Sequence, residues 1–571
     1  MDNAALADAL LEMAQVLEFL DENPFKAKAY ERAAKSIYEL ATPVEELLDT
    51  GEINQVKGIG LTIAATLRTW VKDQDFSLLT DLQAQLPKGF TELMKVPGLG
   101  MKRLKTLHNI LGVSTIEDLL EAVETGRLEQ IKGFSDKNIE KLKDSVKALL
   151  DYRGWYLIDA ARGWADAIAS LLKDSGLKVY ITGVCRRYME TVSLVDLLCE
   201  EKSSLHEKIT SCLGSIPDMK SEFQDTMLVS TCPGRPTVRI QTVSSELVVP
   251  ALFYTTGSST HVDRMNAAGH ARSIKVTRQG VFKEGNLVSV RDEEELYGLF
   301  GLQYLPPEAR EGRQLEMDLA LSGNRTELIS AEDLRGVLHI HTNYSDGRAT
   351  LKDMVRGAHE RGYSWIGISD HSRSAYYAGG MSIKTLKKQF DEIDELNKGF
   401  KGITIFKGIE TDILPDGSLD YPQEILRQFD FIIASVHSHM GMDKVSMTER
   451  IIKAVRNPFT TILGHPTGRL LLARGPYEVD MEAVLAEAAM IGVMVEINAH
   501  PMRLDLDWRL IPGFVAHGGR VVIAPDAHVV GGLDDMRYGL AIARKGLLTK
   551  RACVNALDTQ DAREAFASRW S

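Results

Sequence analysis

Short apolar runs alternate with helical patterns between residues 336 and 545. In chain order the runs read GVLHIH, WIGISDH, TIFKGIE, FIIASVH, TTILGH, VMVEIN and VVIAPDAH. Most of them are separated by a stretch whose apolar residues follow the helical period. This alternation predicts parallel strands in a β/α architecture, and seven such units predict a distorted barrel.

The first 150 residues follow a helical period that glycine turns interrupt. Two turns match closely, VKGIG at 56–60 and VPGLG at 96–100, and IKGFS at 131–135 is a degenerate third. A Gly-x-Gly corner between two helices lets backbone amides reach a DNA phosphate, although helix corners without a ligand also carry such glycines. The predicted contacts are made by Gly58, Gly60, Gly98 and Gly100.

Residues 155–310 combine strand-like runs, at 178–182 and 238–243, with helical stretches, which predicts an α+β region. The segment 306–335 begins with Pro-Pro and is polar. We interpret it as a linker into the barrel.

Composition and charge narrow the class of protein. The 571 residues are 44% hydrophobic, and no apolar run approaches the roughly 18 residues that span a bilayer. Five scattered cysteines form no CxxC pair, which indicates a reducing compartment without a disulfide framework. The acidic N-terminal stretch does not resemble a signal peptide, so we expect a cytoplasmic protein with no membrane partner. The net charge of −12 opposes DNA binding by charge alone but leaves room for local contacts.

Polar residues mark the ends of the barrel strands. The runs end in His339 and His341, Asp370 and His371, Glu410, His437, His465, Glu496, and Asp526 and His528, and Asp346 follows the first run. In β/α barrels the carboxyl ends of the strands form one mouth, where the chemistry lies. A single histidine there is most often a cap or a satisfied core residue, but the joint pattern predicts convergence on one cavity.

So many nitrogen and oxygen donors exceed what one ion requires. We predict two or three divalent ions with Glu410 as a bridge. Imidazole and carboxylate without thiolate suit Zn, Mn or Fe. Clustered cations activate water and clamp the oxygens of an in-line displacement, which makes phosphoester hydrolysis the natural reaction class.

Over about residues 333–565 the chain resembles the polymerase and histidinol phosphatase (PHP) family of metallo-phosphoesterases. The matching pieces are HIHTNYSDG, GISDHS, KGIETDILPDGSLDY, ASVHS, GHPTGRLL, EINAHPMRLDL and PDAH. The resemblance implies a distorted seven-stranded barrel with a trinuclear site. It implies nine metal ligands, namely His339, His341, Asp346, His371, Glu410, His437, His465, Asp526 and His528.

The resemblance also implies a partition of these ligands among the ions. His339, His341, Glu410 and Asp526 would hold one ion. Asp346, His371 and His465 would hold a second. Glu410 and His437 would serve a third, with His528 close by.

Other polar residues near the mouth carry weaker expectations. Arg469 and Arg503 lie just past strand ends and are predicted to grip substrate phosphates, the alternative being surface salt bridges. His439 and His500 are predicted not to be ligands.

The front half resembles family X DNA polymerases, through ENPFKAKAYERAA, GVCRRYMETVSLVDLL, YTTGSSTH and EEELYGLFGLQYLPPEAREGR. The resemblance implies that Arg186 and Arg187 contact substrate phosphates. It divides the chain into a lyase-like helical domain (1–80), a fingers-like helical domain (81–150), a palm-like nucleotidyltransferase domain (151–245), a thumb-like domain (246–315), a linker (316–335) and the PHP domain (336–571).

The departures from the polymerase pattern decide its chemistry. The family holds two Mg ions with three aspartates, but here Leu194 and Arg239 replace two of them and only Asp196 remains. Arg239 places a positive charge where a cation belongs. Thr66 replaces a lysine and cannot form a Schiff base, which needs an amine. We therefore predict an inactive polymerase region, no Mg at the palm, and a DNA-binding role.

The sequence thus predicts a DNA-repair enzyme that acts as a monomer on gapped, nicked or 3′-end DNA at the nucleoid. It would be a metal-dependent 3′→5′ exonuclease with His339, His341, Glu410 and Asp526 as catalytic residues. The alternatives are a gap-filling polymerase with proofreading, a small-molecule phosphatase of the histidinol-phosphate type, and a non-catalytic DNA-binding scaffold.

Overall fold

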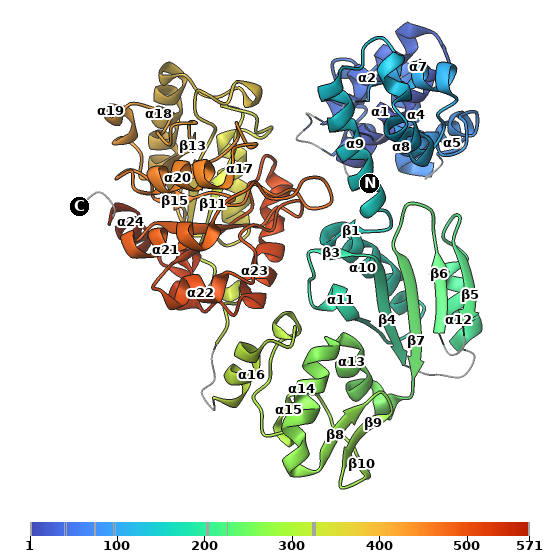
Figure 1. Ribbon diagram of the computed structural model, residues 1–571, viewed down its shortest axis with the longest axis vertical. Coiled ribbons are helices and arrows are strands. Elements are labelled where there is room, and N and C mark those ends of the chain that lie inside the picture. Colours follow the sequence, from blue (N-terminus) through green and yellow to red (C-terminus); the bar gives the residue numbers. More distant parts are fainter. Residues whose placement is uncertain are drawn as a thin grey trace. The chain divides into compact units, whose positions relative to one another are not determined.

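A computed structural model describes residues 3–38, 40, 43–73, 76–94, 96, 99–200, 205–224, 227–322 and 327–568. The chain forms two compact units, Met1–Arg153 and Gly154–Ser571 (Figure 1). No helix among the described residues is long and apolar enough to cross a membrane.

The first unit is helical throughout its described residues. Its helices are α1 Asn3–Phe19, α2 Pro24–Tyr38, α3 Val44–Thr50, α4 Leu61–Arg68, α5 Ser77–Gln83, α6 Phe90–Leu93, α7 Met101–Leu111, α8 Ile116–Glu124 and α9 Asp136–Asp151. Two apolar cores hold them, one centred on Ile63 and Trp70 and one on Phe90 and Leu104. Each helix thus buries an apolar stripe, as its period predicts.

The second unit begins with a mixed sheet and its covering helices. The sheet has the order β2-β4-β7-β6-β5. Its strands are β2 Val179–Thr182, β4 Leu194–Glu200, β5 Lys220–Gln224, β6 Met227–Thr231 and β7 Thr237–Val243, and its helices are α10 Ile158–Asp174, α11 Gly183–Arg186 and α12 Leu205–Leu213, with the short pair β1 Tyr156–Leu157 and β3 Thr191–Val192 beside them. Strands β4 and β7 are parallel, and their register places Asp196 opposite Arg239.

A smaller α+β region follows. It contains α13 Val248–Thr256, α14 Ser259–Gly269, the antiparallel strands β8 Ile274–Thr277, β9 Gly280–Lys283 and β10 Asn286–Val288, then α15 Glu293–Leu299 and α16 Gln314–Leu321. Helix α16 lies within the segment that was predicted to be a linker. This α+β region therefore ends later in the sequence than the polarity of the segment suggested. The reason is that Glu316 is fully buried and accepts bonds from the amides of Gly312 and Arg313, at 2.6 and 3.0 Å.

The C-terminal part is a nearly closed parallel barrel, which confirms the predicted architecture. The strands follow the order β11 to β17, and a bridge between Ile340 and Ala527 brings the last strand back to the first. They are β11 Gly336–Ile340, β12 Trp365–Ile368, β13 Thr404–Asp412, β14 Phe431–Ser435, β15 Ile462–Leu463, β16 Met494–Asn498 and β17 Val521–Ala524. The accompanying helices are α17 Leu351–Glu360, α18 Ile383–Gly399, α19 Gln423–Leu426, α20 Lys444–Val455, α21 Met481–Ile491, α22 Ile511–Ala516, α23 Met536–Lys545 and α24 Thr559–Ala567.

The barrel interior is a packed core away from the mouth. Phe566 of α24 packs against Trp365, Phe406 and Phe431, with ring centroids 5.3–6.0 Å apart. Residues on every strand of the barrel are fully buried. Because aromatic side chains fill this space, only the carboxyl ends of the strands remain for polar chemistry.

Buried charges join the barrel to the two regions before it within the second unit. Lys545 of α23 is fully buried and forms an ion pair with Glu311, which also accepts from Arg187 at 3.0 Å. Arg313 donates to the carbonyl of Lys545, and its guanidinium lies 4.6 Å from the ring centroid of Trp508. Each buried charge therefore has a partner of opposite sign or a polar neighbour, as burial demands.

Candidate metal centre

Four groups of histidine and carboxylate side chains lie at the mouth of the barrel. They are His341, Asp346, His371 and His528; His339, Glu410 and His465; His339, His341 and Asp526; and His371, Glu410 and His437. Within each group the potential ligand atoms lie within 4.8 Å of one another. The four groups share members and together contain the nine residues that the sequence predicted as ligands.

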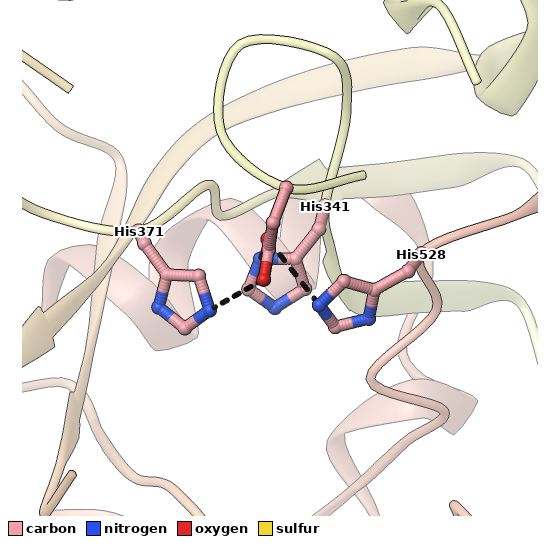
Figure 2. Close-up of side chains that lie close together, drawn as sticks. His341, His371 and His528 are labelled. Carbon is pink, nitrogen blue, oxygen red and sulfur yellow. Dashed lines mark ion pairs between the residues drawn. The ribbon is translucent and has the colours of Figure 1, made fainter. Parts of the chain in front are cut away.

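The first group surrounds the carboxylate of Asp346. Figure 2 shows the rings of His341, His371 and His528 converging, with dashed lines for their ion pairs. Nitrogens of the three rings lie 3.7, 3.6 and 3.3 Å from Asp346 oxygens. The loop that carries Asp346 needs glycine at position 347, because a Cβ there would lie 2.4 Å from the backbone of His341.

Glu410 is the carboxylate that two groups share. Its Oε1 lies 2.9 Å from His465 Nε2 and 3.2 Å from His437 Nε2. Its Oε2 lies 3.0 Å from His371 Nδ1. Each oxygen thus faces a different set of imidazoles, which is the arrangement expected of a bridging carboxylate.

The structure groups these donors differently from the partition that the family resemblance implied. His465 lies with Glu410 and His339, and it forms no group with Asp346 and His371. The reason is strand order. Asp346 and His371 follow the adjacent strands β11 and β12, whereas His465 follows β15, three strands further round the barrel.

Several of these residues adopt an unusual backbone conformation. His339 has a φ of 63° and Asp526 a φ of 53°, in the left-handed region that non-glycine residues rarely occupy. Such conformations concentrate at functional sites, where the surrounding structure enforces them. The pairing of β11 with β12 shifts its register between Val337 and Ile340, so His339 lies at an irregular point of its strand.

Burial and mutual charge prepare the donors for cations. Burial lowers the pKa of His341 to about 3, with help from His528 and His371, so this imidazole is neutral. Burial would raise the pKa of Glu410, but the surrounding histidines, His437 first, hold it well below its usual range. Burial would also lower the pKa of His437 and His528, but nearby carboxylates outweigh it and raise these pKa values to about 10 and about 9. Divalent ions bind neutral imidazoles and ionised carboxylates, so these two rings would release a proton on ligation.

Unsatisfied ring nitrogens provide a test of whether a metal fits. Both ring nitrogens of His341 and one each of His339, His371 and His465 are buried without a well-formed hydrogen bond among the described residues. Buried polar atoms are otherwise almost always paired. These histidines belong to groups of nitrogen and oxygen donors without sulfur, which fits Zn, Mn or Fe.

A second layer of carboxylates orients the imidazoles. Glu496 accepts from His339 Nδ1 and from the amide of His465. Asp412 lies 2.6 Å from His437 Nδ1, and Asp370 accepts from Thr342 at 2.7 and 2.8 Å. Sequence reasoning assigned no role to Asp412, although its position two residues after Glu410 puts both on one face of β13.

The two predicted phosphate-gripping arginines differ in their surroundings. Arg503 Nε lies 3.5 Å from Asp526, at the edge of the donor cluster. Arg469 donates to the carbonyl of Arg503 at 2.9 Å and to Asp507 at 3.0 Å, and it also bonds the carbonyl of Leu504. The geometry favours the structural alternative for Arg469, since its guanidinium is already engaged by the protein. His439 and His500 belong to none of the four groups.

In the sheet before the barrel, Asp196 forms an ion pair with Arg239. Arg239 Nη2 lies 2.7 Å from Asp196 Oδ1, and Nε donates to the same oxygen at 2.8 Å. The predicted phosphate ligands Arg186 and Arg187 are engaged as well, by Glu293 at 2.7 Å and Glu311 at 3.0 Å. All three guanidiniums are therefore committed to carboxylates of the same chain.

The glycine turns of the first unit lie at helix N-termini, as predicted. Gly60 is the N-cap of α4 and Gly100 the N-cap of α7, and Gly58 adopts a φ of 90°. Gly98 lies outside the described residues. These positions leave the first amides of α4 and α7 facing outward from helix ends, where anions bind.

Comparison with known proteins relates these regions to protein families. Residues 1–76 match the helix-hairpin-helix domain, 90–148 the SAM-like helix-hairpin-helix tandem, 251–311 the DNA polymerase beta thumb and 338–500 the PHP domain. The chain is 31% identical to a Bacillus subtilis (strain 168) protein named DNA polymerase/3′-5′ exonuclease PolX, over 98% of each chain. A probable phosphatase of Caldanaerobacter subterraneus is 31% identical over 35% of this chain and 81% of its own. A structure of Leishmania infantum polymerase beta covers 39% of this chain and 98% of that chain, at 17% identity and a TM-score of 0.26.

Proposed function

Since the chain belongs to the family X DNA polymerases that carry a PHP domain, we propose that it is a DNA-repair nuclease whose barrel removes nucleotides from 3′ ends. The observation that carries this proposal is the set of nine donors, four of whose histidines have a buried ring nitrogen without a well-formed hydrogen bond among the described residues. The helix-hairpin-helix and thumb regions imply DNA binding. We propose that its substrate is gapped or nicked DNA in the cytoplasm. We also propose that it binds this DNA as a monomer.

Each residue at the mouth has a role in this reaction. Two or three divalent ions, held by the nine ligands, would supply Lewis acidity for phosphodiester hydrolysis. Arg503 would bind a non-bridging oxygen of the substrate phosphate, because it is the arginine beside Asp526. Glu496 and Asp412 are positioning residues, which hold the rings of His339 and His437 in the orientation that ligation needs.

Labelled DNA tests the reaction and its direction. With 5′-labelled single strands we expect a ladder that shortens progressively, and with 3′-labelled strands we expect labelled mononucleotide from the first turnover. His339→Ala should abolish both signals in the presence of Mn or Zn. Full activity in that variant would refute the barrel assignment.

The same preparation distinguishes the phosphatase alternative. That alternative has one observation in its favour, the similarity of 35% of this chain to 81% of a probable phosphatase. Rapid turnover of p-nitrophenyl phosphate without turnover of DNA would favour it. The helix-hairpin-helix units oppose it, because a small-molecule phosphatase has no need of them.

We further propose that the polymerase-like region binds DNA without catalysing nucleotidyl transfer. The ion pair between Asp196 and Arg239 supports this, because a guanidinium occupies the carboxylate that a Mg ion would need. A single carboxylate does not assemble a two-metal site. DNA binding requires neither residue.

Primer extension checks this prediction. We expect no templated incorporation with Mg or Mn, measured in a Glu410→Gln background so that the nuclease does not remove the primer. A gel-shift with the same primer and template controls for folding and DNA binding. Incorporation that disappears on Asp196→Ala would show that the palm is active and overturn the prediction.

A further inference from the structure

Two adjacent tyrosines project from the rim of the metal centre. Tyr376 is 84% exposed and Tyr377 is 71% exposed, and both belong to a short 3-10 helix after β12. The ring centroid of Tyr377 lies 6.1 Å from that of His371 and 6.3 Å from that of His437. An exposed aromatic pair therefore stands directly beside two of the candidate metal ligands.

The loop that carries the pair is held firmly. Ala375 and Ala378, which flank the tyrosines, are buried. The amide of Ser374 donates to Asp420 at 2.6 Å, and its hydroxyl donates to Asp412 at 3.0 Å. Gly380 packs so closely that a Cβ would lie 2.0 Å from the carbonyl oxygen of Ser372. The backbone thus presents the two rings in a fixed place, which reduces the entropy cost of binding to them.

Neither neighbouring imidazole is stacked on the Tyr377 ring. The rings of His371 and His437 meet it at interplanar angles of 61° and 67°. Neither tyrosine hydroxyl has a hydrogen-bond partner among the described residues, which leaves the rings uncommitted. Flat aromatic faces beside a cationic centre suit one chemical class above others, the unpaired bases of nucleic acids.

We propose that Tyr376 and Tyr377 form a stacking platform for the unpaired base of the nucleotide next to the scissile phosphate. The inference rests on the proposed function, because it requires the barrel to hydrolyse DNA. Since Tyr377 contacts two ligand residues, a phosphate held at the metals places its attached nucleoside within reach of the rings. Every base has a π-face, so the platform selects frayed or unpaired 3′ ends without selecting sequence.

DNA that ends in an abasic residue tests the stacking of the terminal base on the two tyrosines, because it lacks that base. We compare kcat/KM for single strands that end in a normal 3′ nucleotide with strands that end in a tetrahydrofuran abasic residue. The wild-type protein should prefer the base-bearing end by about 5- to 100-fold, the range that loss of one stacked base produces. In Tyr376→Ala/Tyr377→Ala the ratio should fall toward one, whereas Tyr377→Phe should keep the wild-type ratio because stacking needs the ring and not the hydroxyl.

Met490→Ala is the matched control, because Met490 is an exposed apolar residue of the same barrel. It lies near the C-terminal end of α21, which leads into the start of β16, and is therefore away from the mouth. It should keep the wild-type ratio. An unchanged ratio in the double tyrosine variant would overturn the proposal, and so would loss of the ratio in Met490→Ala.

A binding measurement separates this failure from failure of the proposed function. With the metals bound, and with a methylphosphonate in place of the last phosphodiester to prevent hydrolysis, a strand that ends in 2-aminopurine should lose fluorescence on binding the wild-type protein and regain most of it with the double variant. If the protein hydrolyses no DNA, the nuclease proposal fails while the fluorescence still reports stacking. Equal quenching by wild type and variant would exclude the platform.

Discussion

Replacing Glu410 by Gln is expected to lower DNA hydrolysis by at least about 100-fold, since even outer partners of metal ligands are worth about 10–100-fold. Glu410 belongs to two of the four donor groups, and its two oxygens face different imidazoles. A neutral amide cannot bridge two cations. The variant should therefore also retain less metal, which elemental analysis of the purified protein measures beside the nuclease rate.

Glu449→Gln provides the matched control, because Glu449 is an exposed carboxylate on α20 of the same barrel. It should keep the wild-type rate and metal content. Chelation of the wild-type protein should reproduce the loss seen in Glu410→Gln, and added Mn or Zn should reverse chelation but not the substitution. A Glu410→Gln protein with full activity and full metal content would exclude a bridging role.

Arg310→Met is expected to destabilise the thumb-like region by about 3–5 kcal/mol, the usual cost of removing one partner of a buried ion pair. Arg310 is fully buried and binds both oxygens of Glu293, at 2.7 and 3.1 Å, as well as the carbonyl of Leu305 at 2.9 Å. Its loss leaves Glu293 buried with Arg186 alone. Amide hydrogen exchange of α15 in the full chain measures the effect locally, which a multi-domain protein requires.

Arg291→Met is the control for this change. Arg291 also pairs with a glutamate of α15, Glu295, at 3.0 Å, but it is exposed to solvent. Exposed pairs contribute little, so its exchange protection should not change. Equal loss of protection in the two variants would show that burial of the Arg310 pair does not stabilise the region.

The same pair predicts a pH dependence. Burial alone would raise the pKa of Glu293, but Arg310 and Arg186 outweigh it and hold the pKa at about 2, below the ordinary value of 4.5. A carboxylate with a depressed pKa stabilises the fold above pH 4.5 and loses that contribution as the pH falls toward 2. Glu293→Gln should therefore lower exchange protection fully at pH 7 and progressively less below pH 4.5.

The barrel and its donors were predictable because their signal is local. Each strand is a short apolar run, and each run ends in a histidine or carboxylate at the same side of the sheet. Parallel strands bring their carboxyl ends together whatever the connecting helices do. The glycine turns before α4 and α7 were equally visible, since a helix corner is decided by a few consecutive residues.

Contacts between residues that are distant in the sequence could not be predicted from local sequence patterns. Arg469 and Arg503 both follow strand ends, yet only Arg503 lies beside Asp526. The segment of helix α16 was interpreted as a linker because it is polar. Its Glu316 is nevertheless buried, and it accepts a hydrogen bond from a backbone amide, which the pattern of apolar residues does not reveal. The platform of Tyr376 and Tyr377 depends on how their loop anchors to Asp412 and Asp420.

The sequence by itself predicted which histidines and carboxylates lie at the strand ends, because residue identity and strand period can be read along the chain. Only the tertiary structure decided which of these side chains lie together. It placed His465 with Glu410 and left Asp346 among His341, His371 and His528. The physical reason is closure of the barrel, since the bridge between Ile340 and Ala527 makes the first and last strands neighbours. In the preceding sheet, the parallel register of β4 and β7 set Arg239 against Asp196.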